Sequence, residues 1–244
     1  MKFAIRNITS LSSLISNLRK DLNNYKGPVW YRGHYNREWK LLPSLLREKK
    51  SLDEKNLIKK FKQNATMLIN PRPDNWFDWL FIMQHYGVST RLLDWTESPL
   101  IATYFALNDE NQNKNADGRL WILLPVELNK LSNILPDYSY DIPSFEDEIL
   151  NNYEPETLAS ETTSKLFPIA TIAPRNSTRM QAQMSVFTIS HKDQTPIEQL
   201  GDKNHIWCYN IPQSSKQTIM SELKILGITK FQLFPELSSI GHIL

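Results

Sequence analysis

The sequence lacks most of the features that would identify a protein class at once. It has one cysteine, Cys208, so no disulfide can form within the chain, and no zinc site built on several cysteines is available. Its longest apolar runs, such as 120–126, fall far below the roughly 20 residues that cross a bilayer. Residues 1–9 carry two cations and no long apolar stretch. We therefore expect no secretory signal, no membrane association and a reducing, cytoplasmic location.

An excess of charge of one sign is also missing. The 28 basic and 26 acidic residues leave a formal net charge of +2, which is too small to attract nucleic acid over long range. A nucleic-acid partner is therefore allowed but not implied. The chain has no phosphate-binding glycine loop, no dinucleotide-binding glycine triplet, no serine nucleophile elbow and no two histidines at metal-ligand spacing. No metal site is predicted.

Apolar side chains that recur every three or four residues predict several helices. Ser10 is positioned to cap the first, Asp74 or Asn75 to cap a middle one, and Ser98 to cap a buried one that begins with proline. Gly87 is placed to end the middle helix in the left-handed conformation. The predicted helices cover 11–22, a stretch from a capping box at Ser51 and Glu54 to about 69, 76–86, 100–107 and 214–226.

Short apolar and aromatic runs predict strands, several of them late in the chain. This arrangement indicates the α+β class, with N-terminal helices packed on a mixed or antiparallel central sheet. The segment 129–166 is rich in Asp, Glu, Asn and Ser and has no strong period, so we predict a surface insertion in a single domain spanning 1–244. The predicted strands cover 29–32, 92–95, 120–126, 169–172, 186–189, 206–211 and 228–234.

A first candidate site lies at the end of the predicted strand 29–32. Arg32 there, followed by Gly33 and His34, could offer fixed donors to a phosphate or carboxylate, because a glycine lets a ligand or another backbone come close. Arg32 could equally be stacked on Trp39 or paired with a structural acid. The sequence leaves both interpretations open.

A dense polar set lies in 84–95, where a predicted helix end, a sharp turn and a strand follow one another. Buried polar groups cost free energy unless they have partners, so this density indicates function. The candidate catalytic residues of the set are His85 and Asp94, and its candidate ligand-binding residues are Gln84, Ser89, Thr90 and Arg91.

Each charged member of this set also has a structural interpretation. His85 is near a helix C-terminus, whose dipole favours the protonated ring, so His85 is a candidate cation or general acid. A structural hydrogen-bond donor is the alternative. Arg91 and Asp94 could form a half-buried bridge that stabilises the turn, or Asp94 could be a base or ribose acceptor and Arg91 a phosphate ligand.

A third candidate site contains Arg179 and Gln183, which are either one helical turn apart or on the approach to a strand ending at Ile189. Gln183 could read an amide or orient a water molecule. A surface position for this glutamine is the structural alternative.

Several of these residues occur in motifs that resemble the FRG domain family, which is named after an aromatic residue followed by Arg and Gly. The resemblance runs through 30–33, 39–47 and 84–106 and continues through Arg179, Gln183 and 187–188 to 233–237. It implies kinship at the level of the fold. His34 stands where the family commonly has Gln, and Ser185 stands where it commonly has Gly.

The order of these motifs is also similar to that of NAD-dependent ADP-ribosyltransferases. The similarity implies that Arg32 holds the phosphate or ribose of NAD, that Ser89 and Thr90 shape a nicotinamide pocket, and that Gln183 stands where a catalytic Glu is usual. Asp94 would then supply the negative charge. An enzyme of this kind would be an NAD- or nucleotide-using effector of a toxin or phage-defence type.

Two further expectations follow from that similarity. Such an effector would act on a protein or nucleic-acid target and be regulated by an antitoxin or other partner protein. The alternative function is a non-catalytic module that binds an anionic nucleotide or nucleic-acid ligand with the same residues.

Overall fold

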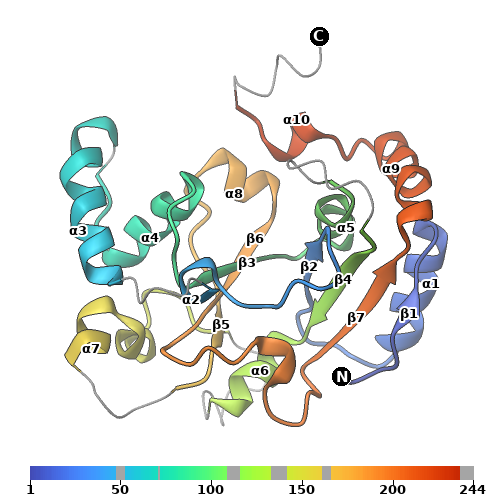
Figure 1. Ribbon diagram of the computed structural model, residues 1–244, viewed down its shortest axis with the longest axis horizontal. Helices are drawn as coiled ribbons and strands as arrows, with labels where there is room; N and C mark the ends of the chain where they lie inside the picture. Colours follow the sequence, from blue (N-terminus) through green and yellow to red (C-terminus); the bar gives the residue numbers. More distant parts are fainter. Residues whose placement is uncertain (48–52, 71, 109–115, 133–141, 161–165, 237–244) are drawn as a thin grey trace.

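The computed structural model describes residues 1–47, 53–70, 72–108, 116–132, 142–160 and 166–236 (Figure 1). Over these ranges the strands form one mixed sheet in the order β1-β7-β4-β2-β3-β6-β5. β1 runs parallel to β7, and the other neighbouring strands are antiparallel. The expected α+β class with a mixed sheet is confirmed. The strands are β1 (Arg6–Asn7), β2 (Trp30–His34), β3 (Leu92–Thr96), β4 (Gly118–Leu123), β5 (Ile169–Thr171), β6 (Ser185–Ile189) and β7 (Ile206–Ile211).

The helices begin mostly at the predicted caps. Ser10 and Asn75 each form a capping box, and Ser98 caps the helix that starts at Pro99. Asp53 caps the helix at Glu54, while Ser51, the predicted cap, lies outside the described residues. The helices are α1 (Leu11–Asp21), α2 (Ser44–Arg47), α3 (Glu54–Ala65), α4 (Trp76–His85), α5 (Pro99–Leu107), α6 (Pro125–Leu131), α7 (Pro155–Ser160), α8 (Thr178–Ala182), α9 (Lys216–Ile225) and α10 (Lys230–Leu233), with short 3-10 helices at Thr66–Leu68, Glu148–Tyr153, Ile197–Gln199 and Gln213–Ser215.

Two of the predicted strands are wrong in part or in whole. The strand predicted at 120–126 ends at Leu123, because Pro125 starts α6 at the position where proline favours a helix. The strand predicted at 228–234 is instead the helix α10, since the side chain of Thr229 accepts a hydrogen bond from the backbone of Gln232 and caps it. A first-turn proline in one segment and a threonine cap in the other therefore favour a helix over the strand that the apolar composition indicated.

One face of the sheet is covered by two separate groups of helices. Over β7, β4 and β2, the helices α1, α5 and α9 pack on Tyr31, Leu120 and Ile122. Over β3, β6 and β5, the helices α3 and α4 pack on Leu92 and Phe187. Strand pairing places all these residues on the same face, and Figure 1 shows the two groups on opposite sides of the molecule. The boundary between the groups lies over β2 and β3.

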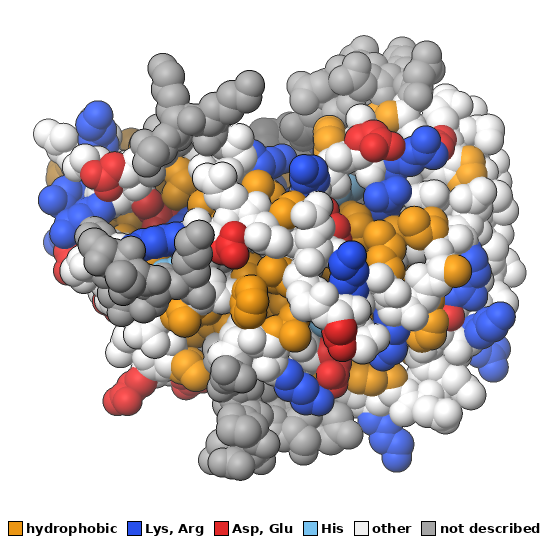
Figure 2. All heavy atoms as spheres, turned by 60° about the horizontal axis from the view of Figure 1, so that its bottom comes forward, with side chains coloured by type: hydrophobic (Ala, Val, Ile, Leu, Met, Phe, Trp, Pro, Cys, Tyr) orange, Lys and Arg blue, Asp and Glu red, His pale blue; other side chains and the backbone are white. Residues whose placement is uncertain are grey.

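The opposite face of the sheet carries a second core. Trp30, Trp95 and Trp121 are buried there against α6 and the 3-10 helix Ile197–Gln199. On the face of the molecule in Figure 2, basic and acidic side chains are interspersed, in keeping with the small net charge. No described helix combines the length and the apolar character that crossing a membrane would require.

The segment 129–166 contributes to the core in its described part. Phe145, Leu150 and Tyr153 are buried and pack with α3 and α4. The Asn129 amide forms hydrogen bonds with both backbone groups of Ala170 on β5. That the segment is an insertion stays a prediction.

Gly33 allows α5 to lie directly on β2. A Cβ atom added at Gly33 would come within 1.9 Å of the Ala102 carbonyl oxygen and 2.5 Å of the Ala106 nitrogen, so the helix backbone occupies the space of a side chain. The sequence-based expectation that this glycine allows a close approach is confirmed, and the approaching group is the backbone of α5.

We predict that Gly33→Ala destabilises the protein by about 3 kcal/mol, because α5 must move off the sheet. Chemical denaturation measures the change. Gly87→Ala is the matched control, since its added Cβ meets nothing within 4 Å and only the φ of 76° opposes it, at a cost of about 1 kcal/mol. Equal losses in the two variants would contradict the close packing.

His191 is a buried histidine whose pKa lies far below its ordinary value. It has no exposed surface, and its Nε2 atom has no hydrogen-bond partner among the described residues. Burial, with smaller contributions from Arg91 and Lys192, lowers the pKa of His191 from 6.5 to about 4. Burial also lowers the pKa values of His34 and His205.

We predict that stability falls as the pH drops from about 6.5 to about 4. In this window the histidines of the unfolded chain bind protons, whereas the buried histidines of the folded chain do not. The lowered pKa of His191 alone would reduce the free energy of unfolding by roughly 3 kcal/mol at the acidic end. Urea unfolding at several pH values gives the slope. His191→Gln should have a shallower pH dependence than the wild type, and parallel curves for the two proteins would refute the prediction.

Candidate functional site

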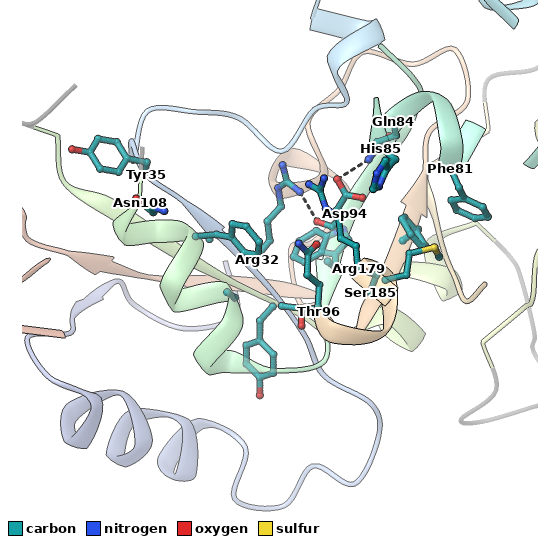
Figure 3. A pocket seen from close by; sticks show the side chains of 18 of the residues that line it. Arg32, Tyr35, Phe81, Gln84, His85, Asp94, Thr96, Asn108, Arg179 and Ser185 are labelled. Atoms are coloured by element: carbon teal, nitrogen blue, oxygen red, sulfur yellow. Dashed lines mark hydrogen bonds between the residues drawn. The ribbon is translucent and has the colours of Figure 1, made fainter. Parts of the chain in front are cut away.

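A cavity lies at the boundary between the two groups of helices. Its volume is about 330 Å³, at the small end of the range for small-molecule sites. Strands β2, β3 and β6 form its floor, with α4, α5 and α8 around it (Figure 3). Six of the ten predicted site residues line it: Arg32, Gln84, His85, Asp94, Arg179 and Gln183.

Arg32 fills a gap between β2 and β3. The two strands pair only at Tyr31 and Thr96, whereas β2 pairs with β4 along its whole length. Beyond that pair, Arg32 Nη1 donates to the backbone carbonyl of Asp94 (Figure 3). Burial lowers the pKa of Arg32, and Arg47 lowers it further, but the charge of Asp94 raises it. An arginine remains protonated at neutral pH, so Arg32 brings a cation to the cavity.

His34, predicted to bind a ligand, does not line the cavity. It contacts the Arg32 side chain instead. It is buried, and its Nε2 accepts a hydrogen bond from Arg32 Nε at 3.0 Å. Its Nδ1 is 3.2 Å from the Trp39 carbonyl oxygen and 3.3 Å from the indole nitrogen of Trp121. Because Arg32 can only donate to Nε2, the proton of the neutral ring belongs on Nδ1, where the Trp39 carbonyl accepts it. Burial and the nearby Arg32 keep the pKa of His34 well below its ordinary value. His34 therefore orients the guanidinium.

Asp94 is the exposed acid of the site. It stands on β3 between the buried Leu93 and Trp95, and its Oδ2 accepts a hydrogen bond of 2.6 Å from Gln84 Nε2. The Thr90 hydroxyl in turn donates to Gln84 Oε1. Thr90 is fully buried and does not line the cavity.

His85 ends α4 beside Asp94 (Figure 3). Its Nε2 is 3.7 Å from the carboxylate of Glu236. Burial, followed by the charge of Arg179, lowers the pKa of His85, and Glu236 raises it less. The pKa of His85 therefore shifts in the direction opposite to the one that the helix dipole alone would favour.

Arg179 and Gln183 bring α8 to the cavity. Of the two predicted arrangements, the helical turn is correct, with Gln183 as the C-terminal cap of α8. Gln183 Nε2 donates to the Leu233 carbonyl at 3.0 Å, and the Arg179 guanidinium lies 4.8 Å from the centre of the Phe234 ring. Both side chains therefore contact the segment after α9 as well as the cavity.

Arg91 is a structural residue, and its partner is not Asp94. Its guanidinium is buried and forms hydrogen bonds of 2.6 Å with the Glu54 carboxylate and with the carbonyls of Ser190 and Tyr153. The bridge expected between Arg91 and Asp94 is therefore wrong. Ser89, in the turn before β3, does not line the cavity either.

The sequence interpretation missed most of the uncharged lining. Thr96 is two residues after Asp94 and so faces the same side of the strand, which strand alternation could have indicated. Phe105 and Asn108 lie one helical turn apart at the end of α5. Figure 3 shows Asn108 and Tyr35 at the far end of the cavity from Asp94. No local signal marks these positions.

Comparison with family models gives one finding. Residues 27–115 match the model of the FRG domain, a range that includes Arg32, Gln84, His85 and Asp94 but not Arg179 or Gln183. Comparisons with curated proteins and with solved structures gave no significant match. The chain thus carries an FRG domain at residues 27–115.

Proposed function

We propose that the cavity binds an anionic nucleotide-type ligand, with NAD as the most concrete candidate. The observation that carries this proposal is the convergence of Arg32 and Arg179 on one cavity, although they are 147 positions apart in the sequence and belong to different elements. Asp94 is the one carboxylate among the described lining residues. Two guanidinium groups against one carboxylate favour a ligand with negative charge, and guanidinium groups match phosphate oxygens in geometry.

The uncharged lining suits the rest of such a ligand. Phe81, Phe105 and Phe187 offer apolar and aromatic surface, on which a base or nicotinamide ring can pack. Thr96 and Asn108 add hydrogen-bonding groups for sugar hydroxyls. The volume of about 330 Å³ suits one nucleoside phosphate half of a dinucleotide.

The chemistry that best fits these groups is cleavage of the bond between ribose and nicotinamide. The bonding electron pair leaves with nicotinamide, positive charge develops on the ribose, and a nucleophile of a protein or nucleic-acid target forms the new bond. Asp94 supplies the negative charge that stabilises the ribose in the transition state. This would be an ADP-ribosyltransferase-like effector of a toxin or phage-defence type.

His85 and Gln183 take different roles from those first expected. Because burial and Arg179 lower the pKa of His85, its neutral ring suits acceptance of a proton from the nucleophile, as a general base, better than donation. Gln183 carries no charge, and its amide nitrogen is bound to Leu233. Its amide oxygen is left to orient the ligand.

A second function, a non-catalytic module for the same class of ligand, is favoured by Gln183. If a carboxylate is needed where this glutamine stands, Asp94 alone does not replace it, and the protein would bind a nucleotide without turning it over. The two functions share one binding site and differ in a single measurable reaction.

We predict that Arg179→Met weakens binding of NAD or ADP-ribose by at least about tenfold, since a charge-assisted hydrogen bond contributes roughly 1.5–3 kcal/mol. Isothermal titration calorimetry measures the affinity. Arg179 is suited to this test because its described contact is a ring stacking at the edge of the fold. Arg37→Met is the control, because Arg37 is exposed, pairs with Glu38 and Asp117 and does not line the cavity; it should bind as the wild type does. Failure of the wild type to bind NAD, ADP-ribose or ATP would refute the proposed ligand class.

We further predict nicotinamide release from NAD when protein or nucleic-acid targets are present. Asp94→Asn keeps the shape of the side chain and should retain binding while release falls at least about 100-fold. Chromatographic measurement of free nicotinamide follows the reaction. Tight binding without release by the wild type would exclude the transferase and support the module.

A further inference from the structure

We propose that Gln84 and Thr90 are positioning residues that set the direction of the Asp94 carboxylate, and that neither binds the ligand directly. This inference rests on the proposed function, in which Asp94 stabilises charge on a ribose. It replaces the ligand-binding roles that the sequence suggested for both residues.

The argument begins with a chain of hydrogen bonds whose direction is determined. The backbone N–H of Leu92 donates to Thr90 Oγ1 at 3.3 Å. The oxygen of the hydroxyl therefore acts as acceptor there, and its hydrogen is available for the amide oxygen of Gln84, which it contacts. Because Oε1 of Gln84 faces this donor, its amide nitrogen must point the other way.

The amide nitrogen of Gln84 meets Asp94. Gln84 Nε2 donates to Asp94 Oδ2 at 2.6 Å, and a flipped amide would place an oxygen against the carboxylate and a nitrogen against the hydroxyl hydrogen. Thr90, which is fully buried, therefore determines which end of the Gln84 amide faces Asp94. Figure 3 shows Gln84 on α4 reaching across to Asp94 on β3.

Asp94 is held from its backbone side as well. Arg32 Nη1 donates to the Asp94 carbonyl, so the residue is bound by β2 through its main chain and by α4 through its side chain. Within the described part of the chain, Oδ1 of Asp94 accepts no hydrogen bond, so it is the oxygen available to a ligand. An exposed carboxylate with a preset direction needs no reorganisation when charge develops beside it.

The first test separates positioning from binding by kinetics. Thr90→Val removes the hydroxyl but keeps the shape, so kcat for nicotinamide release should fall about tenfold while KM stays within about twofold. Thr90→Ser restores the donor and should recover most of kcat. Thr103→Val is the matched control, because Thr103 is equally buried and its hydroxyl, among the described residues, donates to the Pro99 carbonyl on α5. A rise in KM without loss of kcat in Thr90→Val would make Thr90 a binding residue and overturn the proposal.

The second test changes the pH profile. Gln84→Glu places two carboxyl groups in contact, and the charge of each raises the pKa of the other. At acidic pH one of them is protonated and can again donate to the other, so the variant should regain activity as the pH falls toward 5. A purely structural role of Gln84 predicts a uniformly lower rate with the profile of the wild type, and that result would count against positioning.

A third measurement needs no activity, so it distinguishes failure of this inference from failure of the proposed function. The side-chain NH₂ of Gln84 gives two signals in a ¹H–¹⁵N spectrum of the ligand-free protein. Asp94→Asn and Thr90→Val should each shift them, and Thr103→Val should not. Unchanged Gln84 signals in the first two variants would overturn the hydrogen-bond chain even if NAD is cleaved, whereas shifted signals without any turnover would uphold the chain and reject the enzyme.

Discussion

The separation of β2 from β3 is the constraint on which the site depends. Each of these strands is held along its length by its outer neighbour, β4 for β2 and β6 for β3, but the two meet at the single described pair Tyr31 and Thr96. The sheet therefore consists of two well-paired halves, each with its own helical cover. Backbone groups at the opening need other partners, and Arg32 provides one for Asp94. A cavity with a cation at its edge is the consequence.

The charges around this opening are coupled. Burial, followed by the charge of Arg179, disfavours protonation of His85, so the site holds two guanidinium groups and a neutral ring in preference to three cations. An anion placed next to Arg179 would offset that repulsion. Ligand binding and protonation of His85 would then favour each other, as linkage requires for two events that share one electrostatic field. Glu236, 3.7 Å from His85, already acts weakly in this sense without a ligand.

Local signals in the sequence predicted much of the fold and only part of the site. Caps such as Ser10, Asn75 and Ser98 are local, and their helices begin where expected. Around Thr229 the apolar pattern indicated a strand, but the Thr229 side chain caps a helix, and the helix α10 forms there. Partnerships over long range were not predictable, because nothing near Arg91 in sequence marks Glu54 as its partner. The same limit hid the role of His34, whose burial behind Arg32 depends on how β2 packs against Trp39 and Trp121.

The family match divides the site along the chain in a way that has a physical meaning. Arg32, Gln84, Thr90 and Asp94 all lie within residues 27–115, so the hydrogen bonds that orient the Asp94 carboxylate are complete inside the matched range. Arg179 and Gln183 lie beyond it and contact the segment after α9. Under the proposed function, the Asp94 carboxylate, which acts on the ligand, is therefore positioned by residues of the matched range. Arg179 and Gln183, which complete the binding of the ligand, come from the rest of the chain. Changes in 178–236 could then alter which anion is accepted without disturbing the direction of the carboxylate.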